Sequence, residues 1–206
     1  VPWQTNGFEI EFLETENGLD LEKLDSMLSG GEIVSLVHVS NLDGMKLDVQ
    51  EAARIARENG AYTMVDGAQS VPHMPVDVSE YPVDFLAFSG HKMLGPSGTG
   101  GLYVSERAGE KLVPLTYGGG AVKDSSRRSA EFREFPESFE PGLPNVAGIV
   151  GMGEAASFLQ ETGMDNVHRY EKELTETLEA GLEEIDGLRY MSKGSGVVTF
   201  WIDGMD

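Results

Sequence analysis

Three short polar clusters, each placed after a predicted strand, contain the side-chain types needed for chemistry on an amine. They supply two amides, a carboxylate, a hydroxyl, an imidazole and an amine, carried by Asn41, Gln69, Asp66, Ser89, His91 and Lys92. In an open sheet of parallel strands, ligands bind at the carboxyl ends of the strands. We therefore expect these side chains to converge on one crevice.

Lys92 is the candidate nucleophile of this set, because a lysine amine can form a covalent bond with a carbonyl compound. Pyridoxal phosphate requires such a lysine for its aldehyde and an acid facing the ring nitrogen. Asp66 could provide the acid, and Ser89 and His91 could donate hydrogen bonds to the phosphate. Gln69 lies one turn after Asp66 and could reach the ring hydroxyl or the imine. These residue types at these positions are compatible with a pyridoxal phosphate site.

Each of these residues also has an ordinary structural interpretation. An aspartate at a strand end is usually a turn former or a helix N-cap. A lysine in a glycine-rich loop is usually solvated, and Asn41 before Leu-Asp-Gly can be a simple turn residue. The conjunction of Asp66 and Lys92 after two adjacent predicted strands adds weight to the functional interpretation, and spacing alone leaves both interpretations open.

Strands and helices alternate along the chain, which predicts an α/β fold with a mostly parallel sheet. The expected strands span residues 8–13, 33–38, 61–66, 83–89, 101–104 and 197–202. The expected helices span residues 20–29, 47–59, 145–162 and 164–186. In the helix at 47–59, Val49, Ala52, Ala53 and Ala56 should face the core, and Gly60 should end it.

Connection length decides the direction of one strand. The glycine- and proline-rich link between Ser89 and Gly101 is too short for a helical crossover, so the strand at 101–104 should run antiparallel to its neighbour. The link resembles neither a Walker motif nor a dinucleotide fingerprint, and we interpret it as a tight turn. Residues 114–144 have little periodicity and are interpreted as an extended functional excursion.

Charge and composition exclude several function classes. The 206 residues carry a formal net charge of −20, with the acids distributed along the chain, so a nucleic-acid partner is not expected. Such a surface suits a salt-rich cytosol and indicates a halophilic source, with a mesophilic acidic enzyme as the alternative. There is no cysteine, no metal-ligand spacing, no membrane-spanning run and no signal peptide. We expect a cytoplasmic protein without a metal site.

The stretch VDGAQSVPHMPVDVSEYPVDFLAFSGHKMLGPSGTGGLYV at residues 65–104 resembles the core of the SUF-type cysteine desulfurases. These belong to the class V aminotransferase family of fold-type I pyridoxal phosphate enzymes. The resemblance extends through VPWQ, HVSN, GGG and FEPGLPN, at residues 1–4, 38–41, 118–120 and 139–145. It implies a three-layer, aspartate aminotransferase-like large domain at residues 1–163, with its N-terminal part missing. Residues 164–206 would then be a linking helix and the truncated beginning of a small C-terminal α+β domain.

The same resemblance implies a role for each candidate residue. Lys92 would carry the cofactor as a Schiff base, Asp66 would pair with the pyridine nitrogen, and Gln69 would contact the ring oxygen. Ser89 and His91 would hold the phosphate. For the substrate, the family pattern implies that Asn41 helps to bind the carboxylate.

The implied activity is conversion of L-cysteine to L-alanine, with sulfur transferred as a persulfide for assembly of iron–sulfur clusters or another sulfur-containing cofactor. Because the family is homodimeric, the resemblance implies a homodimer in which the loops at 118–120 and 142–145 approach the partner's active site. It also implies a protein that accepts the sulfur. Leu143 departs from the family pattern, which has a phosphate-binding threonine there. Alternatives are another class V lyase or aminotransferase, such as a selenocysteine lyase, and a non-catalytic relative acting as a scaffold.

Overall fold

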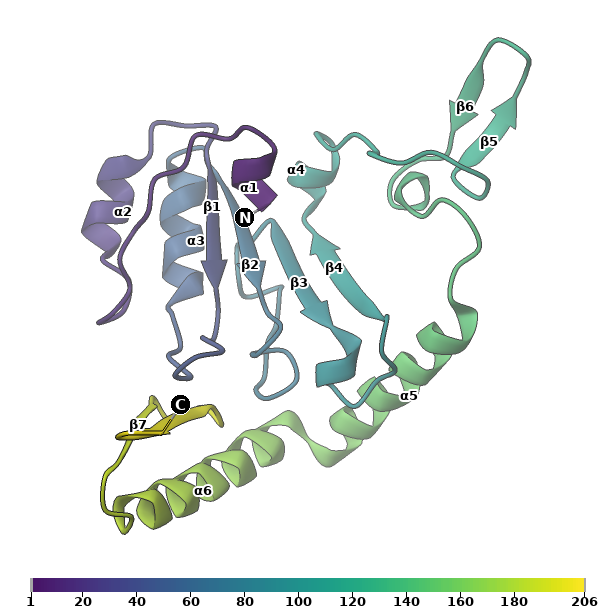
Figure 1. The fold of residues 1–206 in the computed structure, drawn as a ribbon. Helices are drawn as coiled ribbons and strands as arrows, with labels where there is room; N and C mark the ends of the chain where they lie inside the picture. The colour runs from purple at the N-terminus through teal and green to yellow at the C-terminus, as the bar shows by residue number, and fades with distance from the viewer. Residues whose placement is uncertain (1, 206) are drawn as a thin grey trace.

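The computed structural model describes residues 2–205, which form a small α/β body, a long helical arm and two projecting hairpins (Figure 1). The helices are α1 (Pro2–Thr5), α2 (Leu21–Met27), α3 (Val49–Glu58), α4 (Glu106–Gly109), α5 (Val146–Thr162) and α6 (Met164–Glu183), with short 3-10 turns η1 (Gly90–Lys92) and η2 (Glu137–Phe139). The strands are β1 (Ile33–Val37), β2 (Tyr62–Asp66), β3 (Phe85–Ser89), β4 (Gly100–Val104), β5 (Val122–Ser125), β6 (Ala130–Phe132), β7 (Leu188–Ser192) and β8 (Val198–Ile202).

The central sheet has the strand order β1-β2-β3-β4. β1, β2 and β3 are parallel, whereas β4 runs antiparallel to β3. The predicted fold class is therefore confirmed, including the direction of β4. The physical reason is the one given by the sequence: the turn from Ser89 to Gly100 has no room for a crossover helix, so the chain must return along the neighbouring edge.

Helices α2 and α3 cover one face of this sheet. The inward side chains of α3, among them Val49, Ala52 and Ala53, are fully or almost fully buried against apolar residues of β1, β2 and β3. As predicted, Gly60 follows the helix with a left-handed φ of 74°. On the other face of β1, Ile33 and Val37 remain 41% and 42% exposed, so the described residues cover that face incompletely.

One buried ion pair joins β3 to α4 at the end of the sheet opposite the polar clusters. The carboxylate of Asp84 has no solvent exposure and accepts hydrogen bonds from the Thr63 amide at 2.9 Å and the Ser105 hydroxyl at 2.8 Å. Arg107 donates from Nε at 2.6 Å and from Nη2 at 2.5 Å. The guanidinium also donates to the Ala61 carbonyl and lies over the Tyr62 ring. These hydrogen bonds and the ion pair therefore connect β2, the start of β3 and α4.

The prediction of a strand at residues 8–13 is wrong. Among the described residues this segment belongs to no strand, and Phe8 and Phe12 are 52% and 77% exposed. An alternating pattern makes a strand only where a neighbouring strand pairs with it, and no described strand pairs with residues 8–13.

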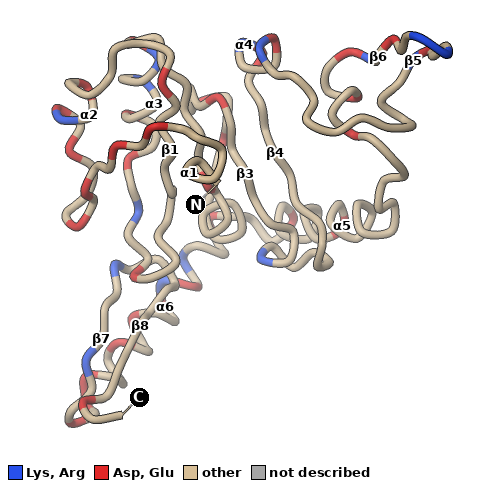
Figure 2. Tube along the Cα trace, turned by 45° about the horizontal axis from the view of Figure 1, so that its top comes forward, with Lys and Arg blue, Asp and Glu red and all other residues tan. Residues whose placement is uncertain are grey.

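Residues 113–143 leave the body and form a projecting segment that carries the β5–β6 hairpin (Figure 1). The prediction of an extended excursion here is confirmed in outline, although the sequence did not reveal the hairpin. Acidic residues are distributed over the whole molecule, and a pair of basic residues, Arg127 and Arg128, lies at the tip of this hairpin (Figure 2).

The chain ends in a C-terminal unit, residues 164–205, that consists of α6 and the antiparallel pair β7–β8. The predicted helix at 164–186 and the strand at 197–202 are present within a few residues, whereas β7 was not expected. Gly163, with φ 85°, separates α5 from α6. The predicted boundary between two domains at residue 163 coincides with this break between the two helices. The division into domains itself stays a prediction. No helix among the described residues is long and apolar enough to cross a membrane.

Candidate functional site

The register of the sheet brings the three polar clusters to one edge. Val37 pairs with Asp66 across β1 and β2, and Asp66 pairs with Ala87 across β2 and β3. Ser89 is two residues beyond Ala87, about 7 Å along the strand, and its side chain therefore projects from the same face as that of Asp66. The carboxylate of Asp66 and the turn that carries Lys92 thus occupy adjacent strand ends.

The turn after β2 is held tightly against β3. The Asp66 carboxylate accepts a hydrogen bond from the Ala68 amide at 2.9 Å, and the Gly67 amide donates to the Ala87 carbonyl at 2.8 Å. A Cβ at Gly67 would lie 3.2 Å from the Ala87 carbonyl oxygen, so a larger residue would push the turn away from β3. The carboxylate of Asp66 itself remains exposed at the edge of the sheet.

The turn after β3 is fixed by backbone contacts of its own. The Gly90 amide donates to the Thr99 carbonyl at 2.9 Å, and the Gly90 carbonyl accepts from Met93 at 3.0 Å and from Gly95 at 2.8 Å. Leu94 has a φ of 65°, a left-handed conformation that is costly for a leucine. Such strain persists only where the surrounding contacts determine it, so His91 and Lys92 project from a rigid turn.

The donors of this edge have no partner of their own within the described chain. Among residues 2–205, no hydrogen bond or ion pair engages the side chains of Gln69, Ser89, His91 or Lys92. A rigid edge with a free amine, hydroxyl, imidazole and amide beside one carboxylate can bind a ligand that is anionic at one end and basic at the other. Within the same residues, no three His, Cys, Asp or Glu side chains gather closely enough to hold a metal ion.

Asn41 lies at the same edge of the sheet but in a separate loop. It is exposed near the tip of the Asn41 loop, residues 39–46, which leaves β1 and is closed by a bridge between Val39 and Lys46. β1 and β3 are separated by two strand spacings, about 10 Å. The structure therefore brings Asp66, Gln69 and the Lys92 turn together, and it places Asn41 at the side of that group.

His38 belongs to the same polar cluster as Asn41 but does not join the site. Its ring is 1% exposed and lies edge-on to Tyr81, with a centroid distance of 5.9 Å. Burial, together with the nearby Lys46 cation, lowers the pKa of His38 from 6.5 to about 4, although the Asp48 carboxylate acts in the opposite direction. His38 is therefore neutral near pH 7 and acts as a packing residue beneath the loop.

One cavity of the described structure lies elsewhere. It measures about 590 Å³, is found between α3 and residues 78–83, and contains none of the candidate residues. Arg54, which lines it, is already paired with Glu51 and Glu58. A smaller cavity of about 250 Å³ adjoins Gln69 and separates the sheet edge from the C-terminal unit.

Sequence reasoning missed the residues of the C-terminal unit that contact the edge. The hydroxyls of Ser195 and Thr199 bond to the Asn41 loop across separations of 151 and 157 residues. Glu171 bonds to His73 across 98 residues. No local pattern marks a contact at that distance along the chain, so no signal in the single sequence could have found them.

Comparison with known proteins gives the same fold. The family model for class-V aminotransferases matches residues 1–206. A probable cysteine desulfurase of Pyrococcus abyssi is 37% identical over 211 residues, which cover 97% of this chain and 53% of that protein. The apo cysteine desulfurase of Thermococcus onnurineus superposes with a TM-score of 0.92 at 36% identity, over 99% of this chain and 54% of that one. For a cysteine desulfurase of Escherichia coli the TM-score is 0.88 at 31% identity, over 94% and 49%. The chain thus spans about half the length of the relatives it matches.

Proposed function

We propose that this chain, which belongs to the class-V aminotransferase family, forms the pyridoxal phosphate-binding part of an enzyme that removes sulfur from L-cysteine. The observation that carries the proposal is the register of β1, β2 and β3, which aligns Asp66 with Ala87 and so sets its carboxylate beside the turn of Lys92. The names of the relatives support the choice of cysteine as the substrate.

The donor set at the strand ends fits pyridoxal phosphate. The cofactor has an aldehyde, a basic ring nitrogen, a ring hydroxyl and a dianionic phosphate. Lys92 offers an amine, Asp66 a carboxylate and Gln69 an amide, while Ser89 and His91 offer donors for an anion. These groups, apart from Asp66 with its bond to Ala68, have no competing partner within residues 2–205, as expected for side chains that serve a ligand.

Each residue then has a defined task. Asp66 would keep a proton on the ring nitrogen, and Ser89 and His91 would hold the phosphate so that the ring stays in register with Lys92. When bound, the cofactor supplies an electron sink for negative charge that develops at the substrate Cα. The amine of Lys92 would take the α-proton, and Asn41 would orient the substrate carboxylate.

The overall reaction needs no oxidant. A thiol attacks the sulfur of L-cysteine, the C–S bond breaks, and the products are L-alanine and a persulfide on that thiol. Because residues 1–206 contain no cysteine, the attacking thiol must come from outside this sequence. We include in the proposal that the persulfide sulfur passes on to an acceptor protein in the cytoplasm.

Alanine formation tests this proposal directly. Incubation of the intact protein with pyridoxal phosphate, L-cysteine and a reducing thiol should yield alanine and sulfide in equal amounts, since each turnover transfers one sulfur. Alanine would be measured by amino-acid analysis and sulfide colorimetrically. Turnover of selenocysteine without turnover of cysteine would instead support a selenocysteine lyase, and absence of any cofactor binding would leave only the scaffold alternative.

We further propose that the intact protein is a homodimer joined through the projecting segment (residues 113–143). This segment exposes large apolar side chains, including Leu115 and Leu143, both 95% exposed, and Val113, 75% exposed. Several large apolar side chains exposed on one projecting segment are typical of an interface. Leu143, which replaces the family threonine, would then contribute apolar area to the interface and no phosphate hydrogen bond.

Sedimentation of the intact protein should therefore give twice the subunit mass. Leu115→Asp should shift the protein towards monomer, because a carboxylate would be buried without a partner at the interface. Phe12→Asp is the matched control, since Phe12 is also exposed, at 77%, but lies on the body. Equal dissociation by both substitutions, or by neither, would contradict this interface.

A further inference from the structure

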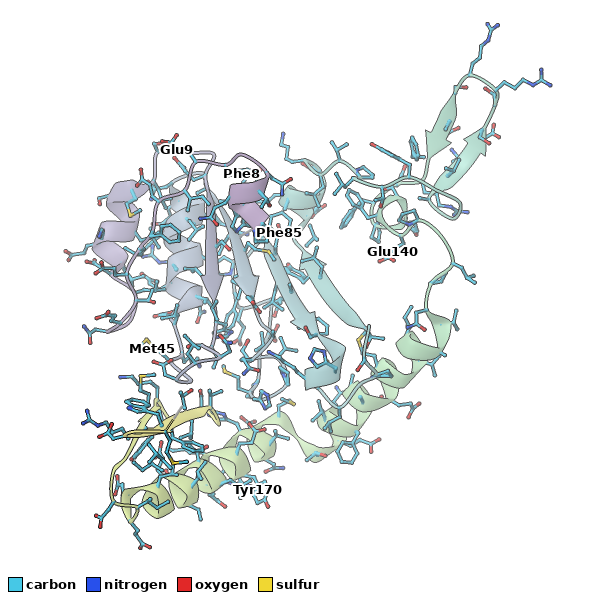
Figure 3. All side chains as sticks on the ribbon, in the orientation of Figure 1. Phe8, Glu9, Met45, Phe85, Glu140 and Tyr170 are labelled. Carbon is cyan, nitrogen blue, oxygen red and sulfur yellow. The ribbon has the colours of Figure 1, made fainter. Side chains whose placement is uncertain are left out.

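The C-terminal hairpin, residues 188–202, is bonded to the Asn41 loop by three hydrogen bonds. The hydroxyl of Ser195 donates to the Gly44 carbonyl, and the hydroxyl of Thr199 donates to the Leu42 carbonyl. The amide of Lys193 donates to the Asp43 carbonyl at 2.7 Å. Figure 3 shows Met45 of the same loop directly above this hairpin. Three successive carbonyls of the loop tip thus depend on the C-terminal unit.

Gly44 permits the close approach of the two segments. Its φ of 74° lies in the left-handed region, which disfavours any side chain. A Cβ at this position would collide with the Ser195 hydroxyl and lie 3.3 Å from the Val197 carbonyl oxygen. The contact is therefore a tight backbone approach and not a loose surface touch.

Hydrogen bonds within the loop tip connect residues 42–44 to the backbone beside Asn41. The Ser40 amide donates to the Met45 carbonyl at 2.9 Å, and the Gly44 amide donates to the Ser40 carbonyl at 3.1 Å. The Ser40 hydroxyl in turn accepts from the Leu42 amide at 3.2 Å. Because the tip is closed on itself, a restraint on residues 42–44 also restrains the position of Asn41.

The cofactor end of the site is held differently. The turns of Asp66 and Lys92 are fixed by bonds to β3 and to Thr99, all within the sheet. Among residues 2–205, one hydrogen bond links the C-terminal unit to the segment that follows Asp66: His73 Nδ1 lies 2.7 Å from a Glu171 carboxylate oxygen. Loss of the hairpin contacts should therefore affect the Asn41 side and leave the Asp66–Lys92 pair in place.

We propose that Ser195 and Thr199 are positioning residues for substrate binding: through Gly44 and Leu42 they hold the Asn41 loop where it can receive the carboxylate of the amino-acid substrate. The inference rests on the proposed function, and it assigns to the C-terminal unit control over substrate affinity without contact with the cofactor. Release of the loop would lower the fraction of protein competent to bind, and the apparent affinity falls in proportion to that fraction.

Steady-state kinetics of the intact protein test whether the hairpin contacts affect substrate binding and leave the cofactor site unchanged. Ser195→Ala and Thr199→Val should each raise the KM for L-cysteine about fivefold, the factor that corresponds to one neutral hydrogen bond. The kcat should remain within about twofold, because saturating substrate restores the bound loop. Cofactor absorbance should not change. Ser157→Ala and Thr177→Val are matched controls, because those hydroxyls bond only to their own helices.

Amide hydrogen exchange of cofactor-free protein supplies a readout that does not need turnover. Residues 39–46 should exchange faster in Ser195→Ala and Thr199→Val than in the wild type and in the two controls. Unchanged exchange would overturn the contact, and faster exchange with an unchanged KM would overturn the positioning role. If the wild type lacks turnover altogether, the proposed function fails and the substrate role fails with it, while exchange still reports on the contact.

Discussion

Lys92→Ala should abolish the visible absorbance that lysine-bound pyridoxal phosphate gives, and it should lower the rate of alanine formation at least about a thousandfold. The reason is chemical: the substitution removes both the amine that binds the cofactor aldehyde and the base that takes the α-proton. None of the neighbouring candidate side chains carries a second amine. Absorbance titration with the cofactor and amino-acid analysis of the product measure the two effects separately.

Two further variants show whether the effect of Lys92→Ala comes from loss of the amine itself. One keeps the positive charge at position 92, and the other removes a lysine elsewhere in the chain. Lys92→Arg keeps the positive charge but should be as inactive as Lys92→Ala, since a guanidinium remains protonated and is a poor nucleophile. Lys111→Ala, at an exposed position beyond α4, should behave like the wild type. Full absorbance in Lys92→Ala would refute the assignment of this residue and, with it, the proposed cofactor site.

Asp84→Ala should destabilise the protein by about 3 kcal/mol, the lower end of the cost of breaking a buried pair. The lower end applies because Arg107 is 34% exposed and can regain water, whereas the Asp84 carboxylate has no exposure. The substitution also leaves the Thr63 amide without its acceptor. Urea unfolding of the intact protein at pH 7 measures the effect, and Asp77→Ala, at an exposed position, is the matched control.

The same pair predicts how stability responds to acid. Burial alone would raise the pKa of Asp84, but hydrogen bonds from Arg107, Thr63 and Ser105 outweigh it and hold the pKa below 3.8. A carboxyl with a lower pKa in the folded state contributes stability that is complete above its unfolded pKa and is lost as the pH falls through the folded value. We therefore expect the difference between wild type and Asp84→Ala to shrink below about pH 4. A constant difference down to pH 2 would contradict this assignment.

Much of the fold could be predicted because its signals are local. Short runs rich in β-branched and aromatic residues predicted β1, β2 and β3, and the apolar spacing of α3 predicted its buried face. The short link before β4 was enough to set its direction. The prediction failed at residues 8–13 and missed β7 for the same reason. A strand forms only when another strand pairs with it, and the residues of a single strand do not reveal its partner.

The set of functional groups at the site can be derived from the amino-acid sequence alone. The order of strands places Asn41, Asp66, Gln69 and the Ser89–Lys92 cluster at strand ends, and parallel strands necessarily present those ends at one edge. Which of these residues are neighbours, and what supports them, became visible in the folded structure. It shows the register that aligns Asp66 with Ala87, the burial of His38, and the bonds from Ser195 and Thr199 to the Asn41 loop. The physical reason is that composition and spacing act within a few residues, whereas register, burial and contacts across more than 150 residues follow from how the whole chain packs.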